Sequence, residues 1–368
     1  MAERRVVDLF AGPGGWDEGL RTLGHRSVGI EIDPSACETA EAAGHTRVRA
    51  DVAGLAPESM GKVWGLIASP PCQAYTQIGK RLGRLDKAEV VACAEEICHG
   101  HDTRSRHLER CRDERSLLTV EPLRWAMALR PRWVALEQVT AVSELWSAFA
   151  ELLADHGYHC ASGILSAERF GVPQVRKRAF LIASLDGAVE LPEPTHRSFD
   201  PRRCCTSALE GEQGLHGWVS MAAALGWSPL RSRSPRRPSG GATCCEREAP
   251  RGADRSVCHR RRRGGLKQAD ASQEVPAWTH ARPATTLLGD PRITAPGSWP
   301  RVGRRPELVR GRPIRVSPAE AGVLQGFRRD YPWRGSRGRR FEQIGNAVCP
   351  PVAARVLAEA MRPSERRV

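Results

Sequence analysis

The chain has 368 residues, enough for one large domain or for a large and a smaller one. Its formal net charge of +14 favours an anionic partner, most commonly nucleic acid. The twelve cysteines are scattered, which is typical of free thiols in a reducing cytoplasm and argues against a disulfide-stabilised secreted protein. No apolar run approaches the length of a membrane span and no signal peptide precedes the first apolar segment, so we expect a cytoplasmic protein without membrane contact.

Residues 5–180 alternate short apolar runs with stretches of helical periodicity. This alternation predicts an α/β fold with a doubly wound, mostly parallel sheet. We expect the strands at residues 6–10, 27–31, 64–68, 133–137 and 178–183. Asp33 and Pro34 are the expected N-cap and first residue of the helix after the second strand.

The composition changes near residue 187. Residues 197–268 are rich in Arg, Ser, Gly and Pro, and only 217–227 looks able to pack, so we interpret the rest as loop or disorder. Order returns near residue 279. Ser317 and Glu320 form a capping box that opens a helix, and residues 345–348 are expected to form a turn before a final helix.

The glycine-rich loop at residues 11–15 directly follows the first strand, where glycines let the backbone turn sharply and approach a ligand. Glu31, at the end of the second strand, could accept both hydroxyls of a ribose. Asp51 could accept an amino proton of adenine. Each acid alone is more often an ordinary strand-end or capping residue, but in this order they predict a nucleoside-type cofactor.

Cys72 follows two prolines at the carboxyl end of a predicted parallel strand, where doubly wound sheets bind their ligands. A lone cysteine is usually a small buried hydrophobe. At this position a thiolate is instead the natural nucleophile for an electron-poor ring carbon. Glu137, at the end of the strand that starts at Trp133, is the candidate acid, although by itself it could be an ordinary surface carboxylate.

Gln174, Arg176 and Arg178 alternate along an extended segment and are therefore expected to share one face. Arginines on that face could hold a base carbonyl, the catalytic acid or a phosphate. A solvated basic run is the alternative interpretation.

Taken together, these motifs resemble those of the bacterial DNA (cytosine-5) methyltransferase family over residues 1–185 and 281–360. The resemblance implies Cys72 as the nucleophile, Glu137 as the acid that activates the ring, and Arg176 and Arg178 as residues that orient the base. It implies an S-adenosyl-L-methionine site formed by Phe10, Gly12, Gly14, Gly15, Glu31, Asp51, Pro71, Asn346 and Val348.

The same resemblance implies the fold of S-adenosylmethionine-dependent methyltransferases with a smaller target-recognition region. We expect a catalytic and cofactor-binding domain at 1–186, a target-recognition region at 187–290, and a return segment with the C-terminal helix at 291–368. The implied partner is double-stranded DNA with a flipped cytosine, because a stacked base cannot present its carbon 6 to a thiol. A cognate restriction endonuclease is an expected system partner, and we expect a monomer.

Three departures from the family pattern bear on these expectations. Gln138 replaces the commoner asparagine after the acid, and Cys349 shifts the closing prolines by one position, which bears on Val348 more than on Asn346. The arginine-rich recognition region is a poor candidate for a packed specificity domain. Two alternatives therefore stay open, namely a catalytically impaired DNA-binding homologue and the same chemistry on RNA.

Two loose groups of cysteine and histidine have spacings that a zinc site could use. They are Cys93, Cys98, His107 and Cys111, and Cys244, Cys245, Cys258 and His259. Neither follows a tight paired-ligand pattern, and the first lies in a stretch predicted to be helical. We therefore expect no metal site.

Overall fold

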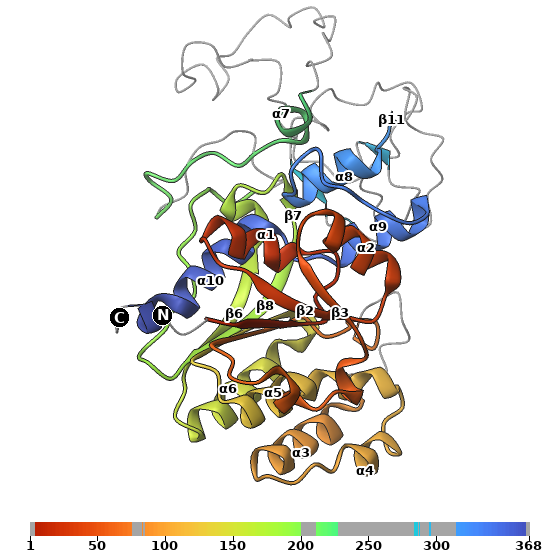
Figure 1. Cartoon of the computed structure of the whole chain (residues 1–368). Coiled ribbons are helices and arrows are strands. Elements are labelled where there is room, and N and C mark those ends of the chain that lie inside the picture. Colours follow the sequence, from red (N-terminus) through yellow and green to blue (C-terminus); the bar gives the residue numbers. More distant parts are fainter. Residues whose placement is uncertain are drawn as a thin grey trace, which may run out of the picture.

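A seven-stranded sheet with the order β3-β2-β1-β4-β5-β8-β6 forms the centre of the molecule (Figure 1). The computed structural model describes residues 4–75, 83, 85–199, 211–226, 283–285, 287, 294–295 and 314–365. The strands of the sheet are β1 (Val6–Leu9), β2 (Ser27–Glu31), β3 (Thr46–Arg49), β4 (Gly65–Ala68), β5 (Trp133–Val139), β6 (His159–Ser166) and β8 (Lys177–Ser184). The five strands predicted from the sequence lie within two residues of their expected bounds.

The first five strands of the sheet are parallel, whereas β8 runs antiparallel between β5 and β6. The predicted doubly wound, mostly parallel sheet is therefore confirmed. Successive side chains of β1 point to opposite faces of the sheet. Val7 and Leu9 therefore belong to one apolar cluster and Val6 belongs to the other.

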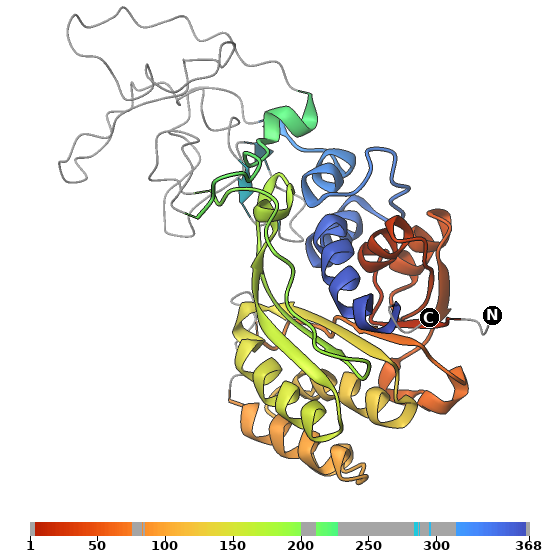
Figure 2. The same cartoon turned by 90° about the vertical axis from the view of Figure 1, so that its left-hand side faces the viewer.

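Helices cover both faces of this sheet (Figure 2). One face carries α1 (Gly15–Thr22), α2 (Pro34–Ala42) and α10 (Pro350–Glu365), and the other carries α3 (Lys87–Cys98), α4 (Arg104–Leu108), α5 (Glu121–Leu129) and α6 (Ser143–Asp155) (Figure 1). The short 3₁₀ helices are η1 (Val52–Gly54), η2 (Pro57–Met60), η4 (Glu114–Val120), η5 (Thr140–Val142) and η6 (Ala167–Phe170). Among the described residues, no helix is long and apolar enough to cross a membrane.

Two helix starts follow the predicted capping chemistry. The Asp33 carboxylate accepts hydrogen bonds from the Ser35 and Ala36 backbone N–H groups, with Pro34 at the first helical position of α2. Ser317 and Glu320 form the reciprocal capping box at the start of α8 (Pro318–Gln325).

A third apolar cluster joins the last part of the chain to the segment before it. It contains residues of α7 (Met221–Leu225), α8 and α9 (Arg337–Asn346) together with Ala284 and Leu287. The short strand β7 (Gln174–Val175) pairs with β9 (Ala284–Thr285), and β10 (Thr294–Ala295) pairs with β11 (Ile314–Arg315). Most of the arginine-rich stretch 197–268 lies outside the described residues.

The structure corrects the expected turn at residues 345–348. Gly345 and Asn346 are the last two residues of α9, and only Ala347 to Cys349 connect that helix to α10. The sequence of α9 hides its helical period because most of its residues are polar, and its buried side chains are limited to Phe341, Gln343 and Ile344.

Close contact between α1 and α10 generates a test of this fold. A Cβ atom at Gly19 would lie 2.8 Å from both the Ala353 Cβ and the Ala354 backbone nitrogen. We expect Gly19→Ala to lower the free energy of unfolding by about 1–3 kcal/mol, because the two helices would have to separate. Urea denaturation followed by tryptophan fluorescence measures this change.

Gly338 is the matched control, since it is also helical but has only the Ser336 Oγ, at 3.9 Å, within contact range of an added Cβ. Gly338→Ala should leave stability unchanged or raise it by up to about 1 kcal/mol, as helix propensity favours alanine. Equal stability of the Gly19→Ala variant and the wild type would contradict the packing argument.

Candidate active site

A cleft of about 280 Å³ opens at the carboxyl ends of β1, β2, β4 and β5. We call it the strand-end cleft. Its lining includes Phe10, Gly12, Gly15, Glu31, Ile32, Pro71, Cys72, Glu137, Arg176, Arg178, Asn346 and Val348. The fold therefore brings most of the residues singled out in the sequence into one hollow, where doubly wound sheets bind ligands.

The loop after β1 follows its tight course because several of its residues adopt positive φ angles. Phe10, Gly12 and Gly14 have φ values of 59°, 55° and 109°. A Cβ at Gly14 would lie 2.7 Å from the Tyr331 Oη, and one at Gly15 would lie 2.4 Å from the Val348 carbonyl oxygen. Gly14 is thus required where the loop contacts the C-terminal segment and is not part of the cleft lining.

Glu31 stands at the end of β2, and its carboxylate is held by three backbone N–H groups. One oxygen accepts from Gly12 and the other from Ile32 and Asp33, each at 2.8 Å. The Ile32 side chain beside it is 62% exposed and lines the cleft. Sequence reasoning missed Ile32, although a large apolar residue directly after a strand-end acid is a signal for an apolar ligand surface.

Asp51 does not line the strand-end cleft. Its carboxylate caps η1 by accepting a hydrogen bond from the Ala53 N–H at 3.0 Å, and its side chain is exposed. Asp51 thus has the ordinary capping role that was the alternative to contacting a ligand.

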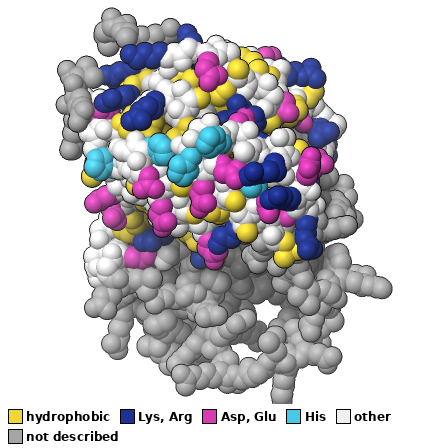
Figure 3. Space-filling view, turned by 90° about the horizontal axis from the view of Figure 1, so that it is seen from below, with side chains coloured by type: hydrophobic (Ala, Val, Ile, Leu, Met, Phe, Trp, Pro, Cys, Tyr) yellow, Lys and Arg dark blue, Asp and Glu magenta, His cyan; other side chains and the backbone are white. Residues whose placement is uncertain are grey.

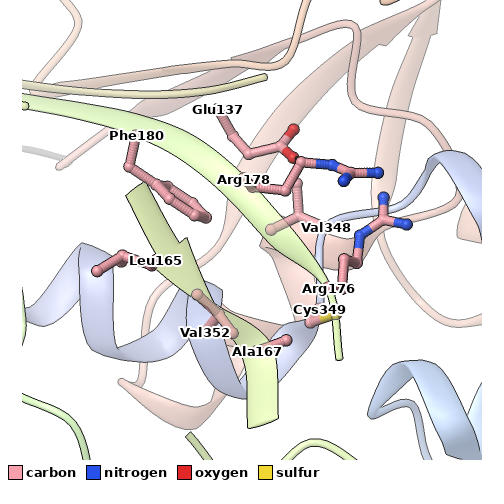
Figure 4. Close-up of a pocket in the computed structure, with 9 residues that line it drawn as sticks. All are labelled: Glu137, Leu165, Ala167, Arg176, Arg178, Phe180, Val348, Cys349 and Val352. Atoms are coloured by element: carbon pink, nitrogen blue, oxygen red, sulfur yellow. The ribbon is translucent and has the colours of Figure 1, made fainter. Parts of the chain in front are cut away.

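Glu137 lies at the bottom of the cleft, with only 4% of its surface exposed. The Arg178 Nε lies 3.1 Å from its Oε1 atom, and Figure 4 shows the two side chains next to each other. Half-buried Cys72 lines the same cleft from the loop after β4. The nucleophile and the acid proposed from separate motifs therefore share one site.

Burial sets the protonation of these two groups. It raises the pKa of the Glu137 carboxyl above its usual value, while the positive charges of Arg178 and Arg176 oppose this rise. Burial also raises the pKa of the Cys72 thiol, with Arg178 lowering it and Glu137 raising it further. Burial thus shifts both groups toward their neutral forms, and the neighbouring arginines shift both toward their ionised forms.

Arg176 lies between β7 and β8 and is 2% exposed. Its two terminal nitrogens donate to the Leu287 carbonyl at 3.4 Å and to the Ala347 carbonyl at 3.2 Å. Burial and the charge of Arg178 lower the pKa of Arg176 to about 10, and it stays cationic at neutral pH. The two side chains approach from different directions in Figure 4, and the guanidinium group of Arg176 ends near that of Arg178.

Two further side chains hold the nucleophile loop and were not predicted as site residues. Gln138 donates from its Nε2 to the Pro70 carbonyl at 2.5 Å, and Trp16 donates from its indole to the Ser69 Oγ at 2.8 Å. Gln138 thus ties β5 to the residues that precede Cys72. The departure from asparagine at this position keeps an amide donor, which explains how the loop tolerates it.

Cys349 is buried beside Arg176, next to Val348 (Figure 4). The shift of the closing prolines leaves both Asn346 and Val348 in the lining of the strand-end cleft. The extra cysteine is accommodated on the far side of this connection, where Val352 and Phe180 pack.

In the first loose cysteine and histidine group, His107 has other partners. Both ring nitrogens of His107 face carboxylates, with Nδ1 2.7 Å from Glu89 and Nε2 3.3 Å from Glu96. Among the residues that the structure describes, no three candidate ligands gather in metal-binding geometry. The second group, at 244–259, lies outside them.

The family model for C-5 cytosine-specific DNA methylases matches residues 4–97 and 104–362. The chain is 24% identical to the type II methyltransferase M1.HphI of Haemophilus parahaemolyticus, over 96% of this chain and 86% of that protein. It is 26% identical to the type II methylase M.HgiDII of Herpetosiphon aurantiacus, over 97% of this chain and 94% of that protein.

Solved structures with the same fold include the Entamoeba histolytica methyltransferase EhMeth, at a TM-score of 0.55 and 12% identity over 98% of this chain and 99% of that one. The S. pombe Dnmt2 methyltransferase aligns with a TM-score of 0.53 and 14% identity over the same shares of the two chains. At these identities the likeness concerns the fold alone. The family model spans nearly all of the sequence, and the chain therefore belongs to the C-5 cytosine-specific DNA methylase family and is an enzyme of this type.

Proposed function

We propose that this chain transfers a methyl group from S-adenosyl-L-methionine to carbon 5 of cytosine in duplex DNA. The observation that carries the proposal is the convergence of Cys72, Glu137, Arg176 and Arg178 in one cleft beside the glycine-rich loop. A thiol, a buried acid and two cations together meet the needs of nucleophilic addition to a pyrimidine ring.

The chemistry of the cleft fits a nucleoside cofactor at its other end. The exposed Ile32 side chain offers an apolar surface to an adenine ring, and the Glu31 carboxylate stands where it can accept ribose hydroxyls. Phe10, Gly12, Gly15, Pro71, Asn346 and Val348 complete the proposed pocket. Gly14 and Asp51 would contribute indirectly, Gly14 by permitting the turn and Asp51 by capping η1.

Carbon 5 of cytosine is too weak a nucleophile to accept a methyl group unaided. The Cys72 thiolate forms a bond to carbon 6, while Glu137 gives a hydrogen bond or its proton to ring nitrogen 3, so that carbon 5 gains enamine character. S-Adenosylmethionine supplies an electrophilic methyl group for carbon 5 when bound. A solvent base then takes the carbon 5 proton, the electrons of that bond re-form the double bond between carbons 5 and 6, and the carbon–sulfur bond breaks to release the Cys72 thiolate. Any proton given to ring nitrogen 3 returns to Glu137.

Arg178 serves two of these groups at once. Its charge favours the Cys72 thiolate and also holds the Glu137 carboxyl in place through the 3.1 Å contact. Arg176 is fixed by two backbone carbonyls and presents a second cation to the base carbonyl.

Glu137 lies at the bottom of the cleft, so the cytosine has to leave the base stack to reach it. The net charge of +14 suits a DNA backbone. The face formed by α3, α4 and α6 carries both charge signs in a mixed pattern (Figure 3), which disfavours it as the DNA-binding face. We extend the proposal to a cytoplasmic monomer that works beside a cognate restriction endonuclease.

Expression in a methylation-free host followed by genome-wide bisulfite sequencing tests this function. The wild-type chain should create conversion-resistant cytosines in one sequence context, and Cys72→Ala should abolish them, because alanine lacks the thiol that forms the bond to carbon 6 in the proposed mechanism. Cys160→Ala is the matched control, since Cys160 is half-buried on β6 at the far edge of the sheet. Methylation that survives Cys72→Ala would refute the mechanism.

The charge of Arg178 generates a second prediction. Because this charge lowers the pKa of the Cys72 thiol, Arg178→Met should raise that pKa. The rate of iodoacetamide alkylation of Cys72, measured peptide by peptide with mass spectrometry, should therefore rise only at more alkaline pH. Methyl transfer at neutral pH should fall by roughly a hundredfold or more.

Lys177→Met provides the comparison, because Lys177 is the exposed neighbour of Arg178 in β8 and carries the same charge. The Lys177 variant should keep the wild-type alkylation profile. An Arg178→Met profile that coincides with the wild type would remove Arg178 from the activation of Cys72.

A further inference from the structure

A buried network of hydrogen bonds lies between the arginine-bearing segment and the C-terminal part of the chain. Its two amide side chains, Gln174 after η6 and Gln325 at the end of α8, are fully buried. The Gln174 Nε2 donates to the Gln325 Oε1 at 2.7 Å and to the Leu324 carbonyl at 3.2 Å. Buried amides persist when their partners satisfy them, so each contact constrains the others.

Two side chains of the arginine-bearing segment bond to the backbone of Leu287, which lies just after β9. Its backbone N–H donates to the Gln174 Oε1 at 2.9 Å, and its carbonyl accepts from Arg176 at 3.4 Å. Both polar groups of this residue are therefore held by side chains of the segment that contains the proposed catalytic arginine.

Two side chains also share the Ala347 carbonyl as their acceptor. It accepts from the Gln325 Nε2 at 2.6 Å and from Arg176 at 3.2 Å. Ala347 stands between Asn346 and Val348, and all three residues line the strand-end cleft. Through this one carbonyl, Gln325 and Arg176 contact the connection that carries the proposed cofactor residues.

We propose that Gln325 is a positioning residue. It fixes the position of the backbone at Ala347, between α9 and α10, and through Gln174 it fixes the position of Arg176. This inference rests on the proposed function of the cleft. Gln325 does not line the strand-end cleft, and it acts by fixing the Ala347 carbonyl, which Arg176 also contacts. Its loss should therefore affect turnover and cofactor affinity together, which loss of a contact to the base alone would not do.

Gln325→Met tests the role, because methionine matches the length of glutamine and removes both polar groups. We expect kcat to fall by roughly ten- to a hundredfold and the cofactor Kd to rise, as a small misplacement of a reacting group is costly. The cofactor Kd is measured by isothermal titration calorimetry with S-adenosylmethionine alone.

Gln325→Glu separates positioning from simple packing. Its carboxyl can still accept from Gln174, but it can donate to the Ala347 carbonyl only when protonated. Activity relative to the wild type should therefore recover as the pH is lowered, whereas the Gln325→Met ratio should show no such recovery. A packing role alone would give both variants the same pH-independent loss.

Tyr158→Phe is the matched control, since it removes a buried 2.8 Å hydrogen bond from the Tyr158 hydroxyl to the Pro131 carbonyl, remote from the cleft. It should keep wild-type kcat and cofactor Kd. The proposal is overturned if Gln325→Met matches Tyr158→Phe in both constants, or if Gln325→Glu shows no acid recovery. Should the wild type methylate no DNA, the proposed function fails, while the calorimetric comparison of the Gln325 variants still tests the positioning role.

Discussion

The contact between Glu137 and Arg178 is the interaction on which the proposed chemistry of the cleft depends. Each side chain would be costly to bury alone, and removing one member of such a buried pair typically costs about 3–5 kcal/mol. One carboxyl group can offset at most one of the two arginine charges, so the cleft keeps surplus positive charge. That surplus suits a site that must ionise a thiol and receive a base attached to phosphates, and it explains why both cations lie at the same end of β8.

The antiparallel course of β8 makes this pairing possible. In the register of β5 and β8, Val139 faces Arg178 and Glu137 faces Phe180, so that Arg178 approaches Glu137 diagonally across the two strands. A parallel strand ends at the same edge as its neighbours, whereas β8 begins there. The start of an antiparallel strand can therefore add the arginines to a cleft that the parallel strands frame with their carboxyl ends.

Local patterns were sufficient to predict the strands, the caps at Asp33 and Ser317 and the placement of Cys72 and Glu137 in one cleft. Each of these follows from the neighbouring residues, since a strand end or a cap is read within a few positions. The network around Gln325 could not be predicted in this way, because its partners Gln174 and Ala347 are 151 and 22 residues away along the chain. The capping role of Asp51 was open from sequence alone, as an acid after a strand serves a ligand or a helix start equally well.

Residues 314–365 and the loop after β1 determine each other's position. Gly14 and Gly15 lack side chains where Tyr331 and Val348 approach the first loop, and the Tyr331 hydroxyl donates to the Pro13 carbonyl at 2.5 Å. The loop and the cleft-lining connection at 346–348 therefore fix each other, and neither has its observed shape alone. Because Gln325 and Arg176 hold the same connection from its other side, one short stretch of backbone sets the geometry of the proposed cofactor pocket and of Arg176. The proposed active site therefore takes this geometry only when residues 314–365 pack against the first loop and the sheet.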